Sequence, residues 1–598
     1  MKMKKLLGLS RSVCSASALL LCAAVLLLPS SAVALPPSLG TVVITVPNTV
    51  LSGDIISAPI ADGLVARIKN AGELNNVKIS TGRRGVLLES ADLTVKNSNI
   101  SSTGLGSLGS AVYLNNSTIN IADSVISTAH GYGIYAKNGS AVTVKGGSIN
   151  KASGMGDEYG AYAEAGSSLD ISGSNIVVSG DRDNGVGVKQ NSLLKLTNVS
   201  IDVTGVNANG IWVQESSSAD IKDTVVTVRN KGGIGAQIRN SSAVQMDNVS
   251  ITTYGDADGF GVGYGVYVAG ERSATPPIAA VTPVIKNSVI KTFGKGSLGV
   301  VATYGSKAQL IDTDVATAGV NAHGFFMNGK ASIEMRGGSL TTVGDGASAG
   351  YALGNSELTL DSTKIKVDGN AYAFRMDDGT VRLKNIDSLT NKEGLLLEAT
   401  DYHYRAFSSF YLESSFYLES SKVSGLIQHR KYYDGYISAL NVSLTNSVWS
   451  GYAQSERYKD NANININVDN GSVWNVTDNS YTNGALVNNG AVNFGSSQEE
   501  GFKEVSVNNY SADGGVLVMK TDLNNKEKSD LLLVKGAAAG KSAINVYNTA
   551  PSGAERSNAL VKVMGDSANA DFVLRNPDIM IHIVASSSAG AWHYPLDN

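Results

Sequence analysis

The stretch GAYAEAGSSLDISGSNIVVSGDRDN (160–184) and its successor GVGVKQNSLLKLTNVSIDVTGVNAN (185–209) decide the fold. In both, a Gly is followed by apolar residues at offsets +1, +3, +9, +11, +16 and +18; from Gly185 these are Val186, Val188, Leu194, Leu196, Ile201 and Val203. Each pair is two residues apart, which is the spacing of one face of a β-strand. Three short strands per repeat predict one rung of a right-handed parallel β-helix, an all-β fold of stacked repeats.

The same register continues along most of the chain. Fourteen Gly or Ala residues open a rung, and their mean spacing is about 25 residues, enough for three short strands and three turns. Past Gly350 we expect a slip, because offset +9 falls on Thr359, between two leucines, which predicts a turn one residue shorter. The expected openers are Gly63, Gly85, Ala111, Gly133, Gly160, Gly185, Gly210, Gly235, Gly265, Gly299, Gly324, Gly350, Ala371 and Gly394.

Short polar residues separate the apolar pairs. Stretches such as NGSAVTVKGGSI (138–149) place Asn, Gly and Ser between strands, and these residues accept left-handed backbone conformations and hydrogen-bond their own backbone. Because the apolar offsets face inward, we expect Leu196 and Ile221 in the core and Trp212, at offset +2, on the outside. An Asp at Leu196 would then bury an unpaired charge, whereas a change at Trp212 would cost little.

The N-terminus predicts export. Four basic residues precede an apolar run that ends near Leu28, and Ala32-Val33-Ala34 follows, which indicates a secretory signal peptide over residues 1–34. Both cysteines, Cys14 and Cys22, fall inside it, so the remaining chain has no thiol chemistry, as suits passage through an oxidising periplasm. The formal net charge is −4 and basic residues form no stripe, which argues against nucleic-acid binding.

Two insertions interrupt the register. AGERSATPPIAAVTP (269–283) carries three of the 11 prolines and predicts a loop leaving the solenoid wall, either a recognition loop or a neutral insertion. Residues 402–436 are rich in aromatic side chains and contain the tandem duplication FYLESS at 410–415 and 416–421; they form either an interface or a stack where the rungs become irregular. The aromatic residues are Tyr402, Tyr404, Phe407, Phe410, Tyr411, Phe416, Tyr417, Tyr432, Tyr433 and Tyr436.

From about residue 437 the sequence changes character. Its recurring features are two S-x-W turns at Trp449 and Trp474, Asn488-Asn489-Gly490 before Val492, Gly514-Gly515, and KSDLL (528–532) before Gly536. This series resembles the C-terminal passenger region of pertactin-like bacterial autotransporters, and the upstream rungs resemble the β-helix of the same family. The likeness covers about residues 41–590.

The resemblance implies a signal peptide, a β-helix passenger carried to the cell surface, and a C-terminal capping, autochaperone-like region that seeds folding. A cap is needed physically, since the last rung of a solenoid otherwise exposes a sheet edge. We therefore predict a signal peptide (1–34), a parallel β-helix passenger (35–436), a pertactin-like β-helix and capping region (437–590) and a truncated linker (591–598).

Family members carry a further C-terminal β-barrel, and no run of amphipathic strands follows residue 590 here. A natural truncation, a barrel on another chain and a cut sequence remain open as explanations. The first of these would leave the product in the periplasm.

Catalysis is a competing interpretation, because β-helices also serve as polysaccharide lyases and hydrolases with carboxylates on adjacent rungs. The candidate pairs are Asp312 with Asp314, Asp181 with Asp183, and Asp377 with Asp378. No His, Arg and Lys set recurs beside them at the same offset, and Asp is the default residue of such turns. We therefore assign no catalytic residue.

Other motifs also fail to predict a site. Gly565-Asp566-Ser567 lacks the His and Asp context of a nucleophile, and GVGYG (261–265) leads into a strand rather than a helix. The six histidines are scattered without metal-ligand spacing, so we expect neither a metal nor a cofactor. They are His130, His323, His403, His429, His582 and His593.

The sequence therefore predicts a noncatalytic passenger, an adhesin or virulence-related cell-contact protein at the cell surface, in the outer membrane or outside the cell. Its expected partners are ligands on host or bacterial surfaces and, in trans, an outer-membrane translocation barrel. Two alternatives remain, a β-helical polysaccharide lyase or hydrolase and a nonfunctional remnant held in the periplasm, because a fold alone does not establish a function.

Overall fold

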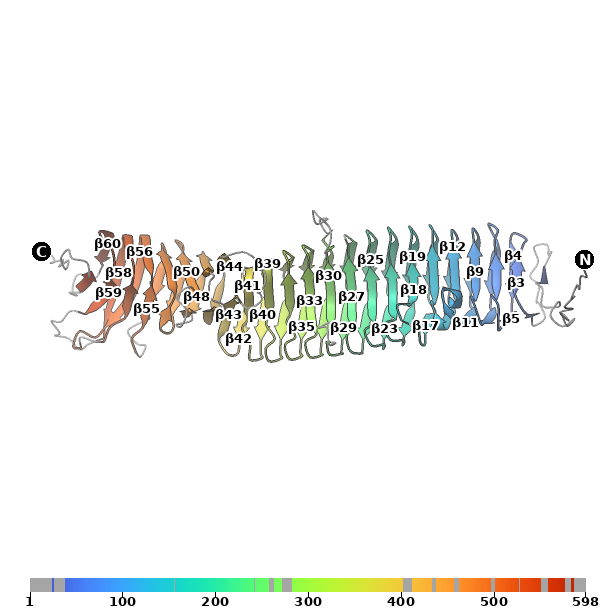
Figure 1. Cartoon of the computed structure of the whole chain (residues 1–598), viewed down its shortest axis with the longest axis horizontal. Coiled ribbons are helices and arrows are strands. Elements are labelled where there is room, and N and C mark those ends of the chain that lie inside the picture. Colours follow the sequence, from blue (N-terminus) through green and yellow to red (C-terminus); the bar gives the residue numbers. More distant parts are fainter. Residues whose placement is uncertain are drawn as a thin grey trace, which may run out of the picture. The chain divides into compact units, whose positions relative to one another are not determined.

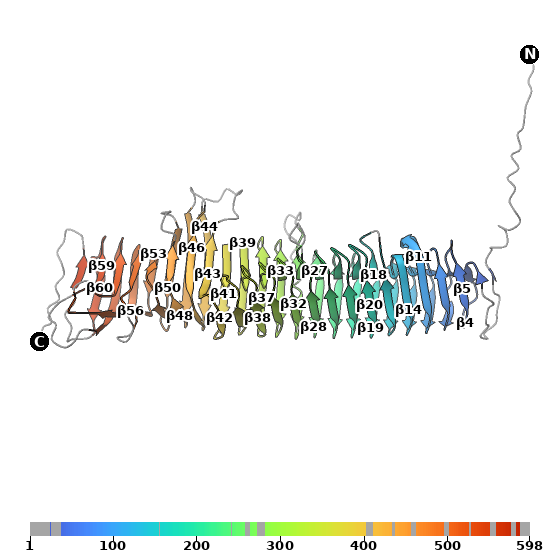
Figure 2. The same ribbon diagram turned by 90° about the horizontal axis from the view of Figure 1, so that it is seen from below.

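Parallel strands dominate the computed structural model. It describes residues 24–25, 38–154, 156–240, 242–257, 263–271, 282–401, 411–432, 437–455, 462–495, 501–525, 528–549, 558–575 and 582–585. The chain forms two compact units, Met1–Ile201 (unit 1) and Asp202–Asn598 (unit 2). Among the described residues the one helix is η1 (Ser107–Gly109), a single 3-10 turn that contacts β11 (Asn99–Gly106) (Figure 2). No helix in these ranges is long and apolar enough to cross a membrane.

A rung consists of three strands, as the sequence predicts. One rung runs through β18 (Tyr159–Ala163), β19 (Ser168–Ser172) and β20 (Asn175–Val178). These strands pair in parallel with β15 (Ile134–Lys137), β16 (Ala141–Lys145) and β17 (Ser148–Lys151) of the preceding rung. The offset residues are buried, including Leu196 in unit 1 and Ile221 in unit 2, so the inward assignment is confirmed.

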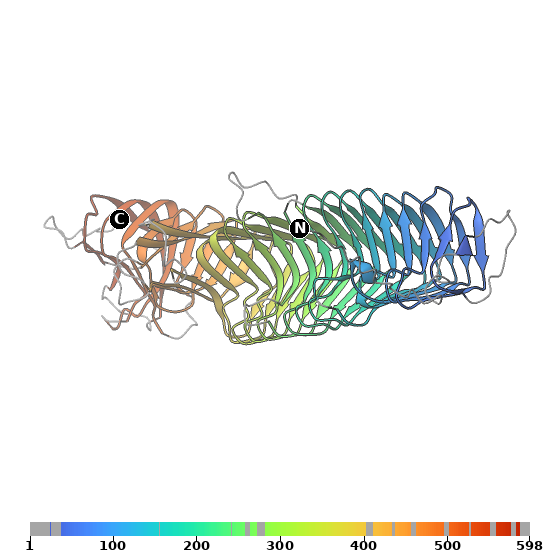
Figure 3. The ribbon, with the colours of Figure 1, turned by 45° about the vertical axis from the view of Figure 1, so that its right-hand side comes forward.

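Stacked rungs give unit 1 three faces (Figures 1 and 3). Face one contains β1 (Ala24–Val25), β3 (Val42–Ile44), β6 (Leu64–Ala66), β9 (Val86–Glu89), β12 (Val112–Asn115), β15, β18 and β21 (Asn184–Val188). Face two contains β4 (Thr49–Ser52), β7 (Gly72–Asn75), β10 (Asp92–Lys96), β13 (Thr118–Ala122), β16, β19 and β22 (Leu193–Thr197). Face three contains β2 (Ser38–Leu39), β5 (Ile55–Ala58), β8 (Lys78–Thr81), β11, β14 (Val125–Gly131), β17 and β20.

The turn between faces two and three has the chemistry expected from the sequence. Asn76, Asn97 and Asp123 occupy the same position in successive rungs with φ of 57°, 45° and 45°, and Gly146 follows with φ of 69°. This left-handed conformation is accessible to Asn, Asp and Gly. The next residue is often a buried serine, as at Ser98, whose hydroxyl accepts a hydrogen bond from the backbone N–H of the rung before.

Unit 2 continues the same plan. Face one contains β24 (Asn209–Val213), β27 (Ile234–Arg239), β30 (Tyr264–Ala269), β33 (Leu298–Thr303) and β36 (Phe325–Asn328). Face two contains β25 (Ser218–Lys222), β28 (Ala243–Asp247), β31 (Val284–Lys286), β34 (Lys307–Ile311) and β37 (Ser332–Arg336). Face three contains β26 (Val225–Val228), β29 (Ser250–Thr253), β32 (Val289–Thr292), β35 (Asp314–Thr317), β38 (Ser339–Thr342), β40 (Lys364–Val367) and β42 (Leu389–Asn391). The long strands β39 (Gly350–Asp361) and β41 (Phe374–Lys384) pass through faces one and two without a break.

The expected openers Gly350, Ala371 and Gly394 are wrong. Gly350 lies opposite Phe325 and Phe374, in the first inward position, so Ala349 opens that rung. Counted from Ala349, the buried residues Leu358, Leu360, Ile365 and Val367 keep the offsets +9, +11, +16 and +18, so this rung loses no residue. The shortening comes one rung later, at an irregularity opposite Leu353. Alanine replaces glycine at this opener, which is why the glycine pattern misled.

The two remaining openers are displaced by two residues. Phe374 lies opposite Leu397, so Ala373 and Leu396 open these rungs rather than Ala371 and Gly394. Beyond them unit 2 continues through a last series of strands. They are β43 (Leu395–Thr400), β44 (Tyr411–Glu419), β45 (Lys422–Ser424), β46 (Leu426–Arg430), β47 (Ile437–Thr445), β48 (Val448–Gly451), β49 (Ala453–Ser455), β50 (Ala462–Val468), β51 (Val473–Val476), β52 (Ser480–Tyr481), β53 (Asn483–Asn488), β54 (Ala491–Asn493), β55 (Glu504–Val507), β56 (Asn509–Thr521), β57 (Leu531–Val534), β58 (Ala538–Asn548), β59 (Ala559–Val563), β60 (Asn569–Leu574) and β61 (His582–Ala585).

The two tryptophans of this series lie in strands, not in the expected turns. Trp449 is in β48 and Trp474 is in β51, where they face each other in the parallel register and are fully buried. Only the serines before them, Ser447 and Ser472, belong to the turns. The S-x-W pattern therefore marks the entry of a buried strand.

Candidate functional site

The outward positions of face one in unit 1 form a continuous apolar column. Offset +2 of successive rungs places these side chains in register on the outer side of the sheet. The first three are aliphatic and the last three are tyrosines, so the column changes from aliphatic to aromatic along the unit. Its members are Val43, Val65, Leu87, Tyr113, Tyr135 and Tyr162.

Two further tyrosines join the aromatic part. Tyr132 and Tyr159 each precede an opener, and their rings stack on those of the column. Centroid separations are 4.8 Å for Tyr132–Tyr135 and 4.5 Å for Tyr159–Tyr162. We name the set of Tyr113, Tyr132, Tyr135, Tyr159 and Tyr162 the tyrosine ladder.

Glu164 holds the hydroxyl groups of the ladder. Its carboxylate accepts hydrogen bonds from the Tyr135 hydroxyl at 2.5 Å and from the Tyr162 hydroxyl at 3.2 Å. Burial and these contacts raise the pKa of Tyr135 and Tyr162, and burial raises the pKa of Tyr132 to about 12. Tyr132, Tyr135 and Tyr162 are therefore un-ionised at physiological pH, and Glu164 orients the hydroxyls of Tyr135 and Tyr162.

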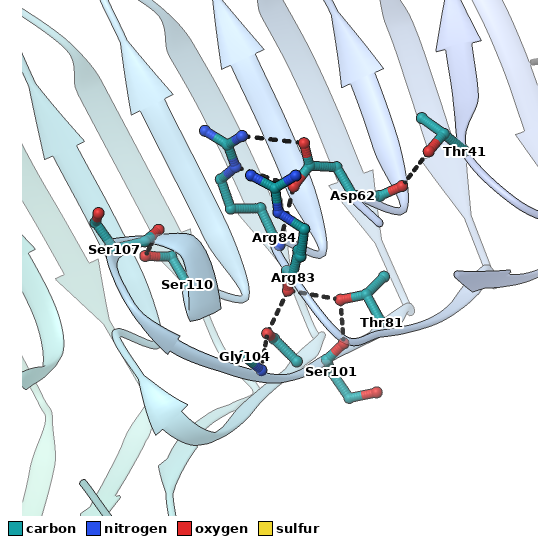
Figure 4. A network of polar contacts seen from close by, with 10 residues as sticks. Thr41, Asp62, Thr81, Arg83, Arg84, Ser101, Gly104, Ser107 and Ser110 are labelled. Carbon is teal, nitrogen blue, oxygen red and sulfur yellow. Dashed lines mark hydrogen bonds and ion pairs between the residues drawn. The ribbon is translucent and has the colours of Figure 1, made fainter. Parts of the chain in front are cut away.

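Cations flank the Tyr113 end of the ladder. The Arg84 guanidinium lies 5.2 Å from the centroid of the Tyr113 ring, and the Lys137 ammonium lies 5.3 Å from it. Arg84 is fixed by Asp62, because its Nε and Nη2 donate to the two carboxylate oxygens at 3.0 Å each (Figure 4). The residue before it is anchored too, since the Arg83 carbonyl accepts hydrogen bonds from the Thr81 and Ser102 hydroxyls.

A buried ion cluster lies close to the other end. Lys151 Nζ is 2.8 Å from Glu158 Oε2 and 3.0 Å from Asp183 Oδ2, and all three side chains are withdrawn from solvent. Lys151 also donates to the Ser153 carbonyl, so the cluster ties Ser153 and Glu158 to the solenoid wall. The negative charge of Glu158 contributes to the raised pKa of Tyr132, after burial.

The structure does not bring the proposed carboxylate pairs together as an acid and a base. Asp183 belongs to the Lys151 cluster, whereas Asp181 is exposed. Asp377 is fully buried, whereas Asp378 accepts a hydrogen bond from Asn355 at 2.8 Å.

Asp312 lies in a turn, and Asp314 is the first residue of β35. Asp312 has a φ of 45°, as in the other turn positions, and Asp314 accepts a hydrogen bond from the Ser339 hydroxyl at 2.6 Å. Asp566 likewise caps a turn, accepting a hydrogen bond from Ala568 N. The carboxylates of Asp314 and Asp566 therefore have structural partners.

The described histidines have separate partners. His429 contacts the Asn463 carbonyl and the Ser438 hydroxyl, His323 accepts a hydrogen bond from Ser348 N, and His130 lies 3.0 Å from the Ser153 hydroxyl. In the part of the chain that the structure describes, no three His, Cys, Asp or Glu side chains are placed to hold a metal ion.

Several sequence features lie outside the described residues. These are the signal peptide save residues 24–25, most of the loop 269–283, the start of GVGYG, residues 402–410 and 433–436 of the aromatic segment, His403, His593 and the segment 586–598. For His582 only the backbone is described.

Sequence reasoning missed the tyrosine ladder because it searched for aromatic density, which is highest at 402–436. The usable signal was positional: three successive openers, Ala111, Gly133 and Gly160, each have Tyr at offset +2. The half-buried Trp212 occupies the same offset in unit 2.

Two family models match the chain. The model described as right-handed beta helix region matches residues 38–181, and Autochaperone Domain Type 1 matches residues 482–596. The BrkA autotransporter of Bordetella pertussis strain Tohama I is 30% identical over 126 residues, which are 20% of this chain and 12% of that relative. The chain therefore spans 12% of the length of this curated relative.

Two solved structures are also similar. The cryo-EM structure of the Vag8–C1 inhibitor complex contains a chain 14% identical, with a TM-score of 0.41, covering 91% of this chain and 100% of that one. The autotransporter UpaB of E. coli strain CFT073 is 12% identical, with a TM-score of 0.17, covering 88% and 95%. Both scores are low, so neither structure bears on the function of this chain.

Proposed function

We propose that the chain is a pertactin-like autotransporter passenger and that it is a noncatalytic adhesive protein, which contacts other cells through the tyrosine ladder. The observation that supports this most is the ladder itself, five tyrosines gathered on the outer side of one sheet. The proposed partner is a protein on a host or neighbouring bacterial cell. Export to the cell surface or the extracellular space accompanies this function.

The ladder has the properties of a protein-binding surface. Tyrosine offers a large rigid area with a polar tip, and it is enriched at the centre of interfaces. Here the rings already stack on one another and Glu164 already holds two hydroxyls, so little side-chain entropy is lost on binding. The flanking Arg84 and Lys137 add cations at one end, where they can orient an approaching partner.

Cell binding tests the proposal. Tyr132 and Tyr135 are the half-buried members of the ladder, whereas Tyr113, Tyr159 and Tyr162 are buried beneath the surface. The double variant Tyr132→Ser/Tyr135→Ser therefore removes the accessible ring area and leaves the inward core intact. We expect purified protein with these changes to bind target cells at least about tenfold more weakly, as for loss of hot-spot tyrosines. Tyr254→Ser is the matched control, because Tyr254 is also an exposed stacked aromatic residue, in unit 2. Unchanged binding by the double variant, with unfolding unchanged, would refute the role of the ladder.

The polysaccharide lyase or hydrolase alternative predicts a different outcome. Incubation with a panel of polysaccharides would then release shorter chains, and substitution of the responsible Asp would abolish the cleavage. The buried positions of Asp183 and Asp377 give no support to this alternative. Chain cleavage that depends on any of the Asp pairs would overturn the noncatalytic assignment.

The periplasmic alternative is tested on intact cells. If the passenger is displayed, added protease degrades it while periplasmic marker proteins survive. A passenger that is present in the cells and resists this treatment as the markers do would contradict surface display.

A further inference from the structure

Two arginines converge on one buried glutamate on the outer side of face one in unit 2. Arg375 is in β41, Glu398 is in β43, and Arg430 is at the end of β46. Arg375 Nε donates to Glu398 Oε2 at 2.8 Å, and Arg430 Nη1 lies 3.1 Å from Glu398 Oε1. Each carboxylate oxygen thus serves a different arginine. We name this set of three residues the arginine clamp.

The clamp is accessible from one side. The Glu398 side chain is 5% exposed, whereas the side chains of Arg375 and Arg430 are 35% and 38% exposed. Arg375 uses Nε for Glu398, and no described residue accepts a hydrogen bond from its two Nη atoms. Arg375 is therefore held by its inner edge and presents its two Nη groups to solvent, as a preorganised oxyanion site requires. Arg430 is held by Glu398 at Nη1 and by Gln428 at Nη2, and it adds a second positive charge beside them.

The local charge differs from that of an ordinary surface ion pair. Two guanidinium groups share one carboxylate in the clamp. At a second arginine of β41, Arg382, negative charge is in excess, because Glu357 and Glu419 both lie within ion-pair distance of it. Arg382 also lies over a tyrosine ring, that of Tyr417 at 4.1 Å, just as Arg375 lies over Tyr351 at 5.1 Å. The two arginines therefore differ chiefly in surplus charge.

Aromatic rings continue the outward column beside the clamp. Tyr351 lies next to Arg375 in the parallel register, and Phe326, which is half-buried, lies next to Tyr351 with ring centroids 5.7 Å apart. On the other side Gln428 is fixed by Arg430 and by the Tyr372 hydroxyl. A ligand at the clamp would thus meet the cationic fork of Arg375, with the half-buried Phe326 ring two strands away beyond the buried Tyr351.

We propose that the arginine clamp binds an acidic glycan through the carboxylate of one sugar residue. The oxyanion is matched by the outer edge of Arg375, with the charge of Arg430 beside it, and the apolar C–H face of the adjoining sugar in the chain is matched by Phe326, two strands from Arg375. A peptide carboxylate on a flexible side chain has the charge without the adjoining rigid apolar face. The acids Asp377, in β41, and Asp401 are buried, as is Lys431, so all three are withdrawn from solvent. The inference is independent of the tyrosine ladder, which belongs to unit 1.

Titration of the full chain with defined oligosaccharides tests the clamp. The probes are a hyaluronan oligosaccharide, which carries carboxylates and no sulfate, and a neutral chitin oligosaccharide of the same length. We expect the first to bind at low salt and the second to bind at least about tenfold more weakly. Arg375→Gln and Arg430→Gln should each weaken hyaluronan binding about tenfold, while Arg382→Gln leaves it unchanged.

Two further probes test whether the clamp binds another class of acidic ligand. Heparin tests a sulfated glycan, and poly-glutamate tests an acidic peptide. Equal or tighter binding of either one, abolished by Arg375→Gln, would overturn the assignment to a carboxylated sugar. Hyaluronan binding that is absent, or that Arg375→Gln and Arg430→Gln do not alter while the variants unfold at the wild-type midpoint, would overturn the site itself. Either failure leaves the cell-binding test of the ladder unaffected, because that test uses different residues and cells.

Discussion

The indole rings of Trp449 and Trp474 lie one upon the other inside the C-terminal part of unit 2, with centroids 5.0 Å apart and planes 7° apart. Each ring nitrogen donates to a backbone carbonyl, Trp449 to Gly425 and Trp474 to Gly451. The next rungs place the smaller Val492 and Leu517 in the same position. The pair is thus the bulkiest layer of this part of the core, with both polar atoms satisfied.

Trp449→Ala should destabilise unit 2 by roughly 3–5 kcal/mol, the usual cost of truncating a large buried aromatic residue. The cavity would also leave the Trp474 ring without its partner. Urea denaturation followed by circular dichroism measures the change. Trp212→Ala is the control, because this half-buried outward residue should cost distinctly less; a larger loss at Trp212 would reverse the inward and outward assignment.

Lys151→Met should destabilise unit 1 by about 3–5 kcal/mol, because it leaves Glu158 and Asp183 charged and buried together. Lys195→Met is the matched control. Lys195 pairs with Asp170 at 3.2 Å, but both side chains are largely exposed, so its loss should cost under about 1 kcal/mol. Limited proteolysis should also cut residues 151–158 faster in Lys151→Met. Equal stability of the two variants would show that the buried cluster contributes no more than a surface pair.

His429 predicts acid sensitivity of unit 2. Burial, with a smaller contribution from Lys431, lowers its pKa to about 4, so the folded state holds the neutral ring. In the unfolded chain the pKa is about 6.5, so protonation favours unfolding. The contribution is complete above about pH 6.5 and is lost as the pH falls toward 4, by up to roughly 3 kcal/mol.

Unfolding midpoints between pH 7 and pH 4.5 measure this effect. His429→Gln should flatten the pH dependence, and His323→Gln should remove a second contribution, since burial lowers the pKa of His323 to about 4 as well. If the pH dependence of the unfolding midpoint is the same in both variants as in the wild type, other groups cause the loss of stability at acid pH.

Gly319→Ala should destabilise unit 2 by about 1–3 kcal/mol, as overpacking does. A Cβ there would lie 1.8 Å from the Gly294 carbonyl oxygen, and neighbouring rungs repeat this approach at Gly294 and Gly344. Gly305→Ala is the control: its Cβ meets no atom within 4 Å, but its φ of 69° is strained for alanine, so we expect a cost near 1 kcal/mol. Thermal unfolding compares the two, and a smaller loss at Gly319 would contradict the close backbone contact.

Local sequence was enough to predict the scaffold. The inward offsets from Gly185 follow from strand alternation, and the turn glycines and asparagines follow from left-handed φ, both of which depend on residues close in the chain. The register failed at Gly350 because this position does not require glycine: Ala349 opens that rung, and Leu396 opens the rung two further on.

The site could not be predicted in the same way. The tyrosine ladder and the arginine clamp each depend on residues one or more rungs apart. The register of the parallel strands brings these residues side by side, and no local motif marks them. Lys151 is the clearest case: nothing near it in sequence marks a buried lysine, and its second carboxylate partner, Asp183, comes from the following rung.

Glu164 and the raised tyrosine pKa values give the ladder one property that sets it apart from the clamp. Apart from the cations at its Tyr113 end, the ladder offers rings and hydroxyls, and a contact with these has little ionic component, so dissolved salt screens it only weakly. An oxyanion held by guanidinium groups is screened strongly under the same conditions. A rise in ionic strength would therefore weaken binding at the arginine clamp and leave binding at the tyrosine ladder almost unchanged. A single passenger could then stay attached to a cell at high salt while it releases a charged ligand.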